Sequence, residues 1–188
     1  MTTNLHLTTQ RLFMRSVRTT DVQALFDYRS DAETNQYQGW IPQTVDETVD
    51  FVQNRVSPII NQPDTWFQLV ILEQSTKRVI GDVGIHFMDE ESQQVEIGCT
   101  LRKDCHGKGY ATEALKVIIT YLFEELEKHR IVTSIDPQNL ASIALVERLG
   151  FRKEVHFRES IFLNGQWVDD LVYALLKREW RPTEKSHN

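Results

Sequence analysis

The sequence predicts an α/β (α+β) protein with a mixed central sheet and helices on both faces. Three observations predict this class. Alternating apolar residues mark consecutive strands in the middle of the chain, the apolar spacing then becomes helical, and two long strands close the sequence. The resulting order, β-α-α-β-β-β-α-β-α-β-β, is typical of one mixed sheet covered by helices. Because the 188 residues contain no repeat or low-complexity linker, we expect one domain over residues 1–180 and a polar tail over 181–188.

The N-terminal third is expected to form one strand and two helices. The expected elements are a strand at Leu12–Val17, a helix at Thr19–Arg29, a loop or broken helix over residues 30–41, and a helix from Thr44 to Arg55 or Ile60. Thr19 or Thr20 is the expected N-cap of the first helix, since a threonine hydroxyl accepts from a free N–H of the first turn. The T-x-x-E pattern of Thr44–Glu47 predicts a capping box at the start of the second helix.

The rest of the chain predicts six more strands and two more helices. They are strands at Trp66–Leu72, Val79–Phe87, Val95–Leu101, Ile131–Ile135, Phe151–Phe162 and Trp167–Leu176, and helices at Gly109–Glu127 and Asn139–Leu149. Gly98 lies inside a strand, where a glycine marks a bulge or a close approach by another backbone or a ligand. Gly150 is a natural stop for the last helix, and Asn164-Gly165 is a hairpin signal.

Composition and charge exclude several classes of protein. The net charge of −6 argues against nucleic-acid binding and is compatible with a cationic partner such as an amine or a basic peptide. The two cysteines, Cys99 and Cys105, are too few for a disulfide scaffold and lack zinc-site spacing, so no metal is expected. The chain has no signal-like apolar region and no apolar run of about 18 residues, so we expect a cytoplasmic protein without a membrane partner.

The sharpest motif is His106–Thr112, HGKGYAT, where two glycines flank a lysine at the start of a predicted helix. Glycine lets the backbone approach a phosphate, and the first N–H groups of a helix are free to bind an anion. A pyrophosphate fits such a place, although an ordinary glycine-rich turn would have the same spacing. The motif is neither the P-loop G-x-x-x-x-G-K-S/T nor the dinucleotide fingerprint G-x-G-x-x-G.

The same segment resembles a known family. HGKGYATEAL is similar to the cofactor motif of the GNAT N-acetyltransferases, Gln/Arg-x-x-Gly-x-Gly/Ala, with Gly109 and Ala111 at its last two positions and His106 where Gln or Arg is usual. VEIGCTL before it and NLASIALVERLGF after it resemble the flanking family segments. The opening Leu7–Leu12 and the closing FRESIFLNGQWVDDLVYAL resemble the branch that includes RimJ/RimL-type ribosomal-protein N-terminal acetyltransferases, so the resemblance covers nearly the whole chain.

The resemblance implies the GNAT fold, a mostly antiparallel sheet of about seven strands that splays at the cofactor cleft, and acetyl-CoA as co-substrate. In that fold the pantetheine arm pairs with a free strand edge, and the pyrophosphate binds the backbone of the glycine loop. The cofactor-binding residues that match are Cys99, Thr100, Leu101, His106, Gly107, Lys108, Gly109, Tyr110, Ala111, Thr112, Asn139 and Ser142.

Two residues are expected to carry the chemistry. Glu96 is the candidate general base for the amine, directly or through water, and its alternative is a solvated or ion-paired strand carboxylate. The resemblance places Ser142 where it donates to the departing thiolate, with helix capping as its alternative. No tyrosine occurs between Asn139 and Phe151, which departs from the common family pattern. Cys105 lies beside His106, but covalent catalysis is not expected because adjacent side chains in an extended loop diverge.

The acceptor is less determined than the donor. Tyr37, Trp40, Trp66 and Phe87 are candidates for an acceptor-pocket wall, and Asp82, Glu159, Asp169 and Asp170 for attracting a cationic acceptor. The first interpretation is direct acetyl transfer, in a ternary complex, to a protein or peptide N-terminal α-amine. Two alternatives stay open: an enzyme for a small-molecule amine such as an amino sugar, polyamine or antibiotic, and a non-catalytic acyl-CoA-binding regulator. The protein is expected to be a monomer or a homodimer.

Overall fold

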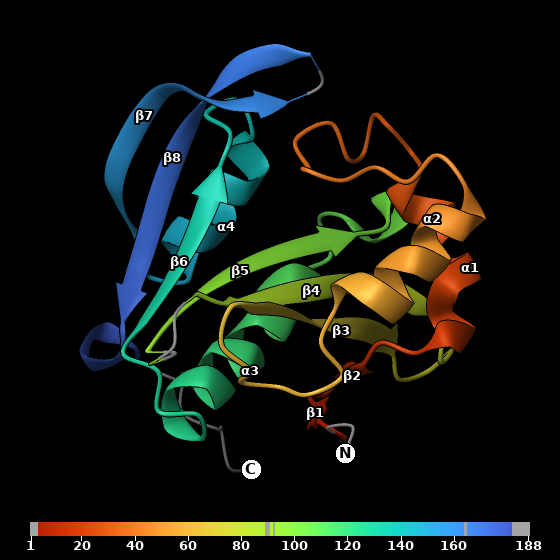
Figure 1. Cartoon of the computed structure of the whole chain (residues 1–188). Helices are drawn as coiled ribbons and strands as arrows, with labels where there is room; N and C mark the ends of the chain where they lie inside the picture. The colour runs from red at the N-terminus through yellow and green to blue at the C-terminus, as the bar shows by residue number, and fades with distance from the viewer. Residues whose placement is uncertain (1–3, 89–90, 92, 164, 182–188) are drawn as a thin grey trace.

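An eight-stranded sheet forms the centre of the computed structural model, which describes residues 4–88, 91, 93–163 and 165–181 (Figure 1). The strands are β1 (His6–Thr8), β2 (Leu12–Ser16), β3 (Thr65–Glu73), β4 (Val79–Phe87), β5 (Gln94–Leu101), β6 (Arg130–Ile135), β7 (Arg152–Leu163) and β8 (Gln166–Leu176). Their order is β1-β2-β3-β4-β5-β6-β8-β7, and only β5 and β6 pair in parallel. The mixed, mostly antiparallel sheet is confirmed, with β1 as an additional strand.

Helices cover both faces of this sheet, as expected. They are α1 (Val22–Arg29), α2 (Val45–Asp50) with a π-helical continuation at Phe51–Arg55, α3 (Tyr110–Glu124) and α4 (Leu140–Arg148). The larger core joins one face of the strands to α3, through side chains such as Leu115 and Ile118 packed with Ile85. A smaller core joins Leu25 of α1 to Val70 on the other face.

The start of α1 differs from the sequence expectation. The N-cap position of α1 is Asp21, not Thr19 or Thr20, because residues 19–21 form a 3₁₀ turn. The buried Asp21 carboxylate accepts from the N–H of Arg18 at 2.8 Å and from the guanidinium of Arg15. A carboxylate makes stronger, charge-assisted hydrogen bonds than a hydroxyl, which explains why it organises this turn.

The predicted cap of α2 forms in part. The Thr44 hydroxyl accepts from the N–H of Glu47 at 3.2 Å, as the motif predicts. The Glu47 carboxylate accepts from the N–H of Gln43 at 2.8 Å, one residue earlier than a capping box requires. Helix α2 therefore starts where the sequence places it, but the Glu47 carboxylate binds the N–H of Gln43 rather than that of the N-cap Thr44.

Strands β5 and β6 separate shortly after they pair. Their ladder consists of Gln94–Glu96 opposite Arg130–Val132. Beyond it, β5 stays on β4 as far as Leu101, and β6 stays on β8 as far as Ile135. Figure 1 shows β6 and β8 running away from β5, with α4 on the diverging arm. Among the described strands none pairs with the β6-facing edge of residues 97–101, so this edge is open to a ligand except at the Leu101 carbonyl, which accepts from His106.

Some expected features fall outside the described residues. Asn164 of the closing hairpin is one, and Gly165, which is described, has a φ of 84° that suits glycine in a tight turn. The expected tail at 181–188 is described only at Arg181. Within the described ranges, no helix combines the length and apolar character needed to cross a membrane.

Candidate active site

Two cavities meet where β5 and β6 separate. We call the larger one, of about 780 Å³, the cofactor cleft, and it lies between the start of α3, α4 and the loop around residues 33–38. The other, of about 570 Å³, is the acceptor cavity, and it lies between β3–β5, the loop at 37–40 and the β7–β8 hairpin. Both cavities are lined by Tyr37, Gln38, Cys99, Asn139, Ser142 and Leu145. These residues form the junction at which a donor and an acceptor would meet.

The glycine loop lines the cofactor cleft at the start of α3. Gly107 and Gly109 have φ values of 71° and 80°, and Gly109 is the N-cap of α3. Within the described chain, no backbone hydrogen bond uses the N–H groups of residues 107–112. Every predicted cofactor-binding residue except Lys108 lines this cleft. The loop therefore has the free donors and the helix dipole that an anion site requires.

Two residues of the loop, His106 and Lys108, make contacts that hold the loop in place. His106 Nε2 lies 2.9 Å from the carbonyl oxygen of Leu101, so its ring donates to the end of β5. This contact ties the start of the loop to the strand edge. Lys108 lies outside the cleft lining, and its carbonyl accepts from Arg11 at 3.0 Å.

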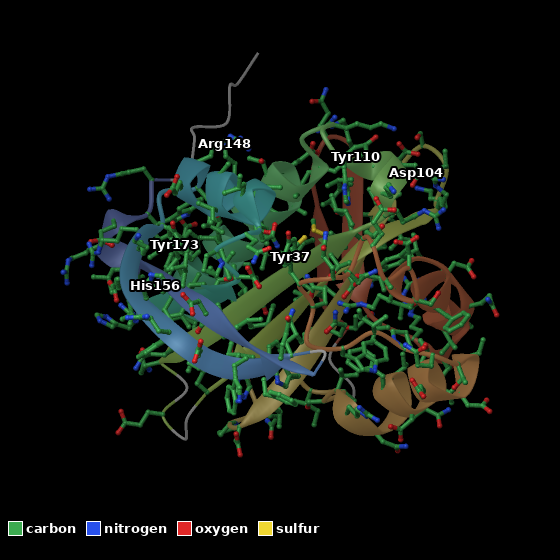
Figure 2. The ribbon with its side chains drawn as sticks, turned by 90° about the horizontal axis from the view of Figure 1, so that it is seen from above. Tyr37, Asp104, Tyr110, Arg148, His156 and Tyr173 are labelled. Atoms are coloured by element: carbon green, nitrogen blue, oxygen red, sulfur yellow. The ribbon has the colours of Figure 1, made fainter. Side chains whose placement is uncertain are left out.

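Other polar groups in the cofactor cleft have unused binding capacity. Thr34 Oγ1 and Thr100 Oγ1 are buried and have no hydrogen-bond partner among the described residues. Both residues line the cleft. Arg148, at the end of α4, lines it too, and its guanidinium lies 3.4 Å from the Thr112 hydroxyl (Figure 2). Buried polar atoms rarely stay unpaired, so these groups fit a ligand rich in amides and phosphates.

The start of α4 separates the predicted roles of Asn139 and Ser142. Asn139 is the N-cap, and its Oδ1 accepts from the N–H of Ser142 at 3.2 Å. The Ser142 hydroxyl makes none of the described hydrogen bonds, so capping does not occupy it. It lies half-buried at the junction of the two cavities. The hydroxyl is therefore available to a ligand atom at the crossing point.

Glu96 lies in the acceptor cavity beside the junction. It is half-buried, and its Oε2 lies 3.8 Å from Nδ1 of His86, its neighbour across β4 and β5. The His86 ring stacks on Trp66 at 4.8 Å, which holds it in place. Burial raises the pKa of Glu96, His86 opposes this, and the charge of Asp170 adds to it. A carboxylate with a raised pKa and access to a cavity is suited to proton transfer.

A buried polar cluster supports the floor of the acceptor cavity. Asp82 is fully buried and accepts from the Tyr28 hydroxyl at 2.5 Å, from the Arg29 guanidinium and from the Gln68 amide. Arg29 also lies 5.5 Å from the ring centroid of Trp40. Sequence reasoning missed this cluster because its members are far apart along the chain. The available signal was polar Gln68 and Asp82 within otherwise apolar strands.

Gly98 opens the floor of the acceptor cavity. It lies opposite Gly84 in a β4–β5 ladder that is continuous, so it does not mark a bulge. A Cβ at Gly98 would meet nothing within 4 Å, whereas one at Gly84 would lie 3.1 Å from Trp66 and Gln68. The glycine therefore leaves space beside the free strand edge.

The walls of the acceptor cavity are aromatic, apolar and acidic. Tyr37, Trp40 and Trp66 line it, whereas Phe87 does not. Phe87 is fully buried on the α3 face, because strand alternation places it with Val95 and Ile85 in the main core. The hairpin adds a facing wall that includes Ile161, Val168, Asp169 and Asp170. Of the other two carboxylates expected to attract a cation, Asp82 is enclosed in its buried cluster and Glu159 is not part of the lining.

The two cysteines have raised thiol pKa values, and the described residues include no group of metal ligands. Burial raises the pKa of Cys99 to about 12, and the charge of Asp82 adds to this effect. Burial also raises the pKa of Cys105, which lies beside Asp104. Both thiols are thus less acidic than free cysteine, unlike catalytic thiols. Among the described residues, no three His, Cys, Asp or Glu side chains are grouped as metal ligands.

Comparisons with known proteins agree with this arrangement. Residues 11–152 match the family model described as "Acetyltransferase (GNAT) domain". The chain is 34% identical over 175 residues to "Uncharacterized N-acetyltransferase p20" of Bacillus licheniformis, covering 93% of this chain and 97% of that protein. It is 30% identical over 183 residues to the ribosomal protein uS5-alanine N-acetyltransferase of Escherichia coli (strain K12), covering 94% and 93%.

A solved structure gives the same result for the fold. A GNAT-family acetyltransferase from Bacillus anthracis matches with a TM-score of 0.83 at 27% identity, covering 93% of this chain and 100% of that one. The family match spans most of the chain, from β2 through α4, and ends at the start of β7. The chain therefore belongs to the GNAT acetyltransferase family and is an N-acetyltransferase of the branch that includes ribosomal-protein N-acetyltransferases.

Proposed function

We propose that residues 1–180 act as one domain that transfers an acetyl group from acetyl-CoA to a protein or peptide N-terminal α-amine. The observation that carries this proposal is the junction of the two cavities at Cys99, Asn139 and Ser142. A donor entering from one side and an amine entering from the other reach the same free edge of β5. This geometry supports direct transfer in a ternary complex, because the two reactants would occupy separate cavities that share one junction.

The residues of the cofactor cleft fit acetyl-CoA. Enzymes of this family use it, and when bound it supplies the thioester whose C–S bond breaks as the N–C bond forms. The edge formed by Cys99, Thr100 and Leu101 offers backbone groups to the pantetheine amides. The N–H groups of residues 107–112 offer donors to the diphosphate, and Arg148 adds a cation at the mouth.

The proposed proton transfers involve two side chains. The attacking α-amine must lose a proton, and its ordinary pKa of about 7.7–8.0 makes this easier than for lysine. Glu96 accepts that proton at a carboxylate oxygen, directly or through water, and His86 lies next to it on β4. The Ser142 hydroxyl donates a hydrogen bond to the leaving sulfur. A backbone N–H of β5 is available to the thioester oxygen, where negative charge develops.

The acceptor cavity favours a cationic amine attached to an extended chain. Glu96, Asp136, Asp169 and Asp170 line it, whereas its two arginines are already paired, Arg29 with Asp82 and Arg55 with Asp50. Apolar and aromatic walls accommodate a first side chain. The Escherichia coli relative is named for acetylating a ribosomal-protein alanine, which supports a protein N-terminus as acceptor.

A panel of amine acceptors tests this proposal, with thiol release from acetyl-CoA as the readout. The panel contains N-terminal peptides that begin with different residues, the same peptides with a blocked N-terminus, and polyamines and amino sugars. We expect turnover with free N-termini and none with blocked ones. Turnover confined to a polyamine or an amino sugar would favour the small-molecule alternative. Binding of CoA without turnover on any acceptor would favour the acyl-CoA-binding regulator.

A further inference from the structure

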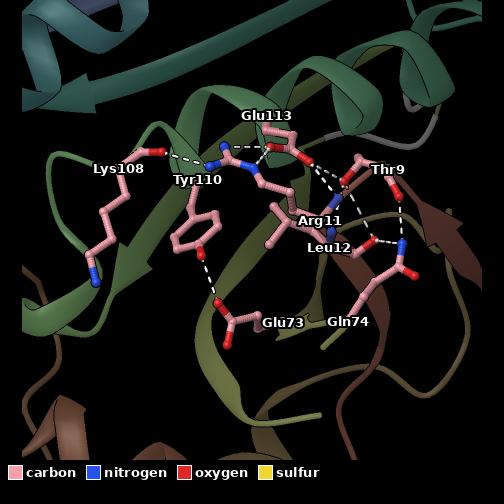
Figure 3. A network of polar contacts seen from close by, with 8 residues as sticks. All are labelled: Thr9, Arg11, Leu12, Glu73, Gln74, Lys108, Tyr110 and Glu113. Atoms are coloured by element: carbon pink, nitrogen blue, oxygen red, sulfur yellow. Dashed lines mark hydrogen bonds and ion pairs between the residues drawn. The ribbon is translucent and has the colours of Figure 1, made fainter. Parts of the chain in front are cut away.

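The outer side of the glycine loop is held by the turn between β1 and β2. Figure 3 shows Arg11 of this turn reaching the loop and the first turn of α3 at once. Its NH1 donates to the carbonyl of Lys108 at 3.0 Å, its Nε donates to Glu113 at 2.7 Å, and its NH2 lies 2.6 Å from the same carboxylate. No other described side chain donates to the Lys108 carbonyl.

This contact sets the orientation of one peptide group. In a trans peptide the C=O of one residue and the N–H of the next point in opposite directions. Arg11 binds the Lys108 carbonyl on the outer side, where Lys108 is not part of the cleft lining, whereas Gly107 and Gly109 are. The Gly109 N–H therefore faces the cofactor cleft. A loop with two residues at positive φ has other accessible orientations, and a reversed peptide would present an oxygen to the diphosphate.

The guanidinium is itself held from several directions. The Glu113 carboxylate also accepts from the Arg11 N–H at 3.1 Å and from the Thr9 hydroxyl at 2.5 Å, so it is locked onto the β1–β2 turn. The Arg11 guanidinium carbon lies 4.5 Å from the ring centroid of Tyr110, whose hydroxyl donates to Glu73 at 2.7 Å. An arginine fixed in this way loses little entropy when it holds the loop.

The pairing also removes an electrostatic conflict. Glu113 lies in the first turn of α3, close to the place where the diphosphate would bind. Its carboxylate stabilises the helix N-terminus but would repel a second anion. Arg11 neutralises it and directs its oxygens toward the turn.

We propose that Arg11 is a positioning residue for the cofactor: by holding the Lys108 carbonyl outward, it keeps the Gly109 N–H directed at the diphosphate. The inference rests on the proposed function, since it assumes that acetyl-CoA occupies the cofactor cleft. It adds a requirement that the glycine motif alone does not contain, because Arg11 is 97 residues away from Lys108 in the chain.

The test compares Arg11→Gln with the control Arg152→Gln. Both variants remove a half-exposed arginine that forms ion pairs, Arg11 with Glu113 and Arg152, on the distant β7, with Glu154 and Glu179. Calorimetry measures the Kd of CoA, and steady-state kinetics compares acetyl-CoA with S-acetylpantetheine, which lacks the diphosphate. For Arg11→Gln we expect the Kd of CoA and the KM of acetyl-CoA to rise about tenfold or more, as for a lost charge-assisted hydrogen bond. The kcat at saturating acetyl-CoA and the kcat/KM for S-acetylpantetheine stay within about twofold.

Further variants separate loop positioning from charge and from folding. We expect Arg11→Lys to recover part of the affinity for CoA. The double variant Arg11→Gln/Glu113→Gln should bind CoA about as weakly as Arg11→Gln. An unchanged Kd in Arg11→Gln, an equal loss with S-acetylpantetheine, or full recovery in the double variant would overturn the proposal. Thermal unfolding of each variant verifies that it is folded. If the wild-type protein itself does not bind CoA, the proposed function fails, and this outcome is distinct from a failure of the role of Arg11.

Discussion

Glu96 Oε2 and His86 Nδ1 lie 3.8 Å apart across neighbouring strands, and Glu96 lines the acceptor cavity. On its other side, His86 Nε2 lies 3.9 Å from Asp64, whose side chain is 91% exposed. The three side chains thus form a polar row that runs from the cavity lining to an exposed carboxylate, with separations longer than a hydrogen bond.

The first prediction concerns the pH dependence of turnover. Because burial raises the pKa of Glu96, this carboxyl holds its proton to a higher pH than an exposed one and accepts a proton only above that pKa. The kcat/KM should therefore rise with pH through the raised pKa of Glu96 and again through that of the amine. Glu96→Gln should remove the lower limb and reduce kcat/KM about 100-fold or more. A pH profile that keeps both limbs in this variant would exclude Glu96 as the base.

The second prediction concerns the leaving thiolate. The Ser142 hydroxyl is free at the junction, so Ser142→Ala should lower kcat by about two- to tenfold, the scale of one hydrogen bond. The Kd of CoA should stay near the wild-type value. Ser57→Ala is a suitable control, since among the described residues that hydroxyl bonds only the backbone of nearby Ile59, donating to its carbonyl at 2.7 Å and accepting from its N–H at 3.1 Å. Unchanged single-turnover rates would remove Ser142 from the mechanism.

The third prediction tests the glycine loop as the diphosphate site. Gly109 has a φ of 80°, and Gly109→Asp adds both strain and a negative charge beside the free N–H groups. CoA binding measured by calorimetry should be lost. Gly109→Ala carries the same strain without the charge and should retain weakened binding. Equal affinities for the two variants would show that charge at this position does not matter, contrary to an anion site.

The fourth prediction separates the two cavities. Gly98 lines the acceptor cavity but not the cofactor cleft, and it has room for a Cβ. Gly98→Val should raise the KM for the amine by about tenfold or more while the Kd of CoA is unchanged, since a bulky group there excludes acceptor atoms from the free strand edge. Gly98→Ala should give a smaller effect in the same direction. A weakened Kd of CoA with an unchanged amine KM would contradict this assignment of the cavities.

The fifth prediction concerns stability. Asp82→Asn leaves the Arg29 guanidinium buried without its charge partner, which should lower the free energy of unfolding by about 3–5 kcal/mol. Asp50→Asn breaks the exposed pair with Arg55 and should lower the free energy of unfolding far less, because solvent screens an exposed ion pair. Urea unfolding of both variants gives the comparison. Similar small losses would show that the buried cluster does not support the cavity floor.

The sequence by itself determined those features that depend on neighbouring residues. The strand Val79–Phe87 has the predicted bounds. Its β-branched residues favour a strand, and turn signals lie beyond both of its ends. Helix α3 follows from its apolar period, and the Thr44 and Asn139 caps follow from side chains that reach an N–H three residues away. The glycine loop, its free N–H donors and its position at a helix start also depend only on neighbouring residues. The likeness of its motif to the family is visible in the sequence for the same reason.

The tertiary structure decided what depends on distant residues. Arg11 meets Glu113 and Asp82 meets Arg29 only because strand order brings them together, and the hydrogen bonds join residues 102 and 53 positions apart. Phe87 looked like a pocket residue, but its register with Val95 turns it into the α3 core. Local propensity and periodicity act over a few residues, whereas a cavity forms where elements fail to pack. The separation of β5 from β6, which joins the two cavities, is therefore a property of the folded sheet.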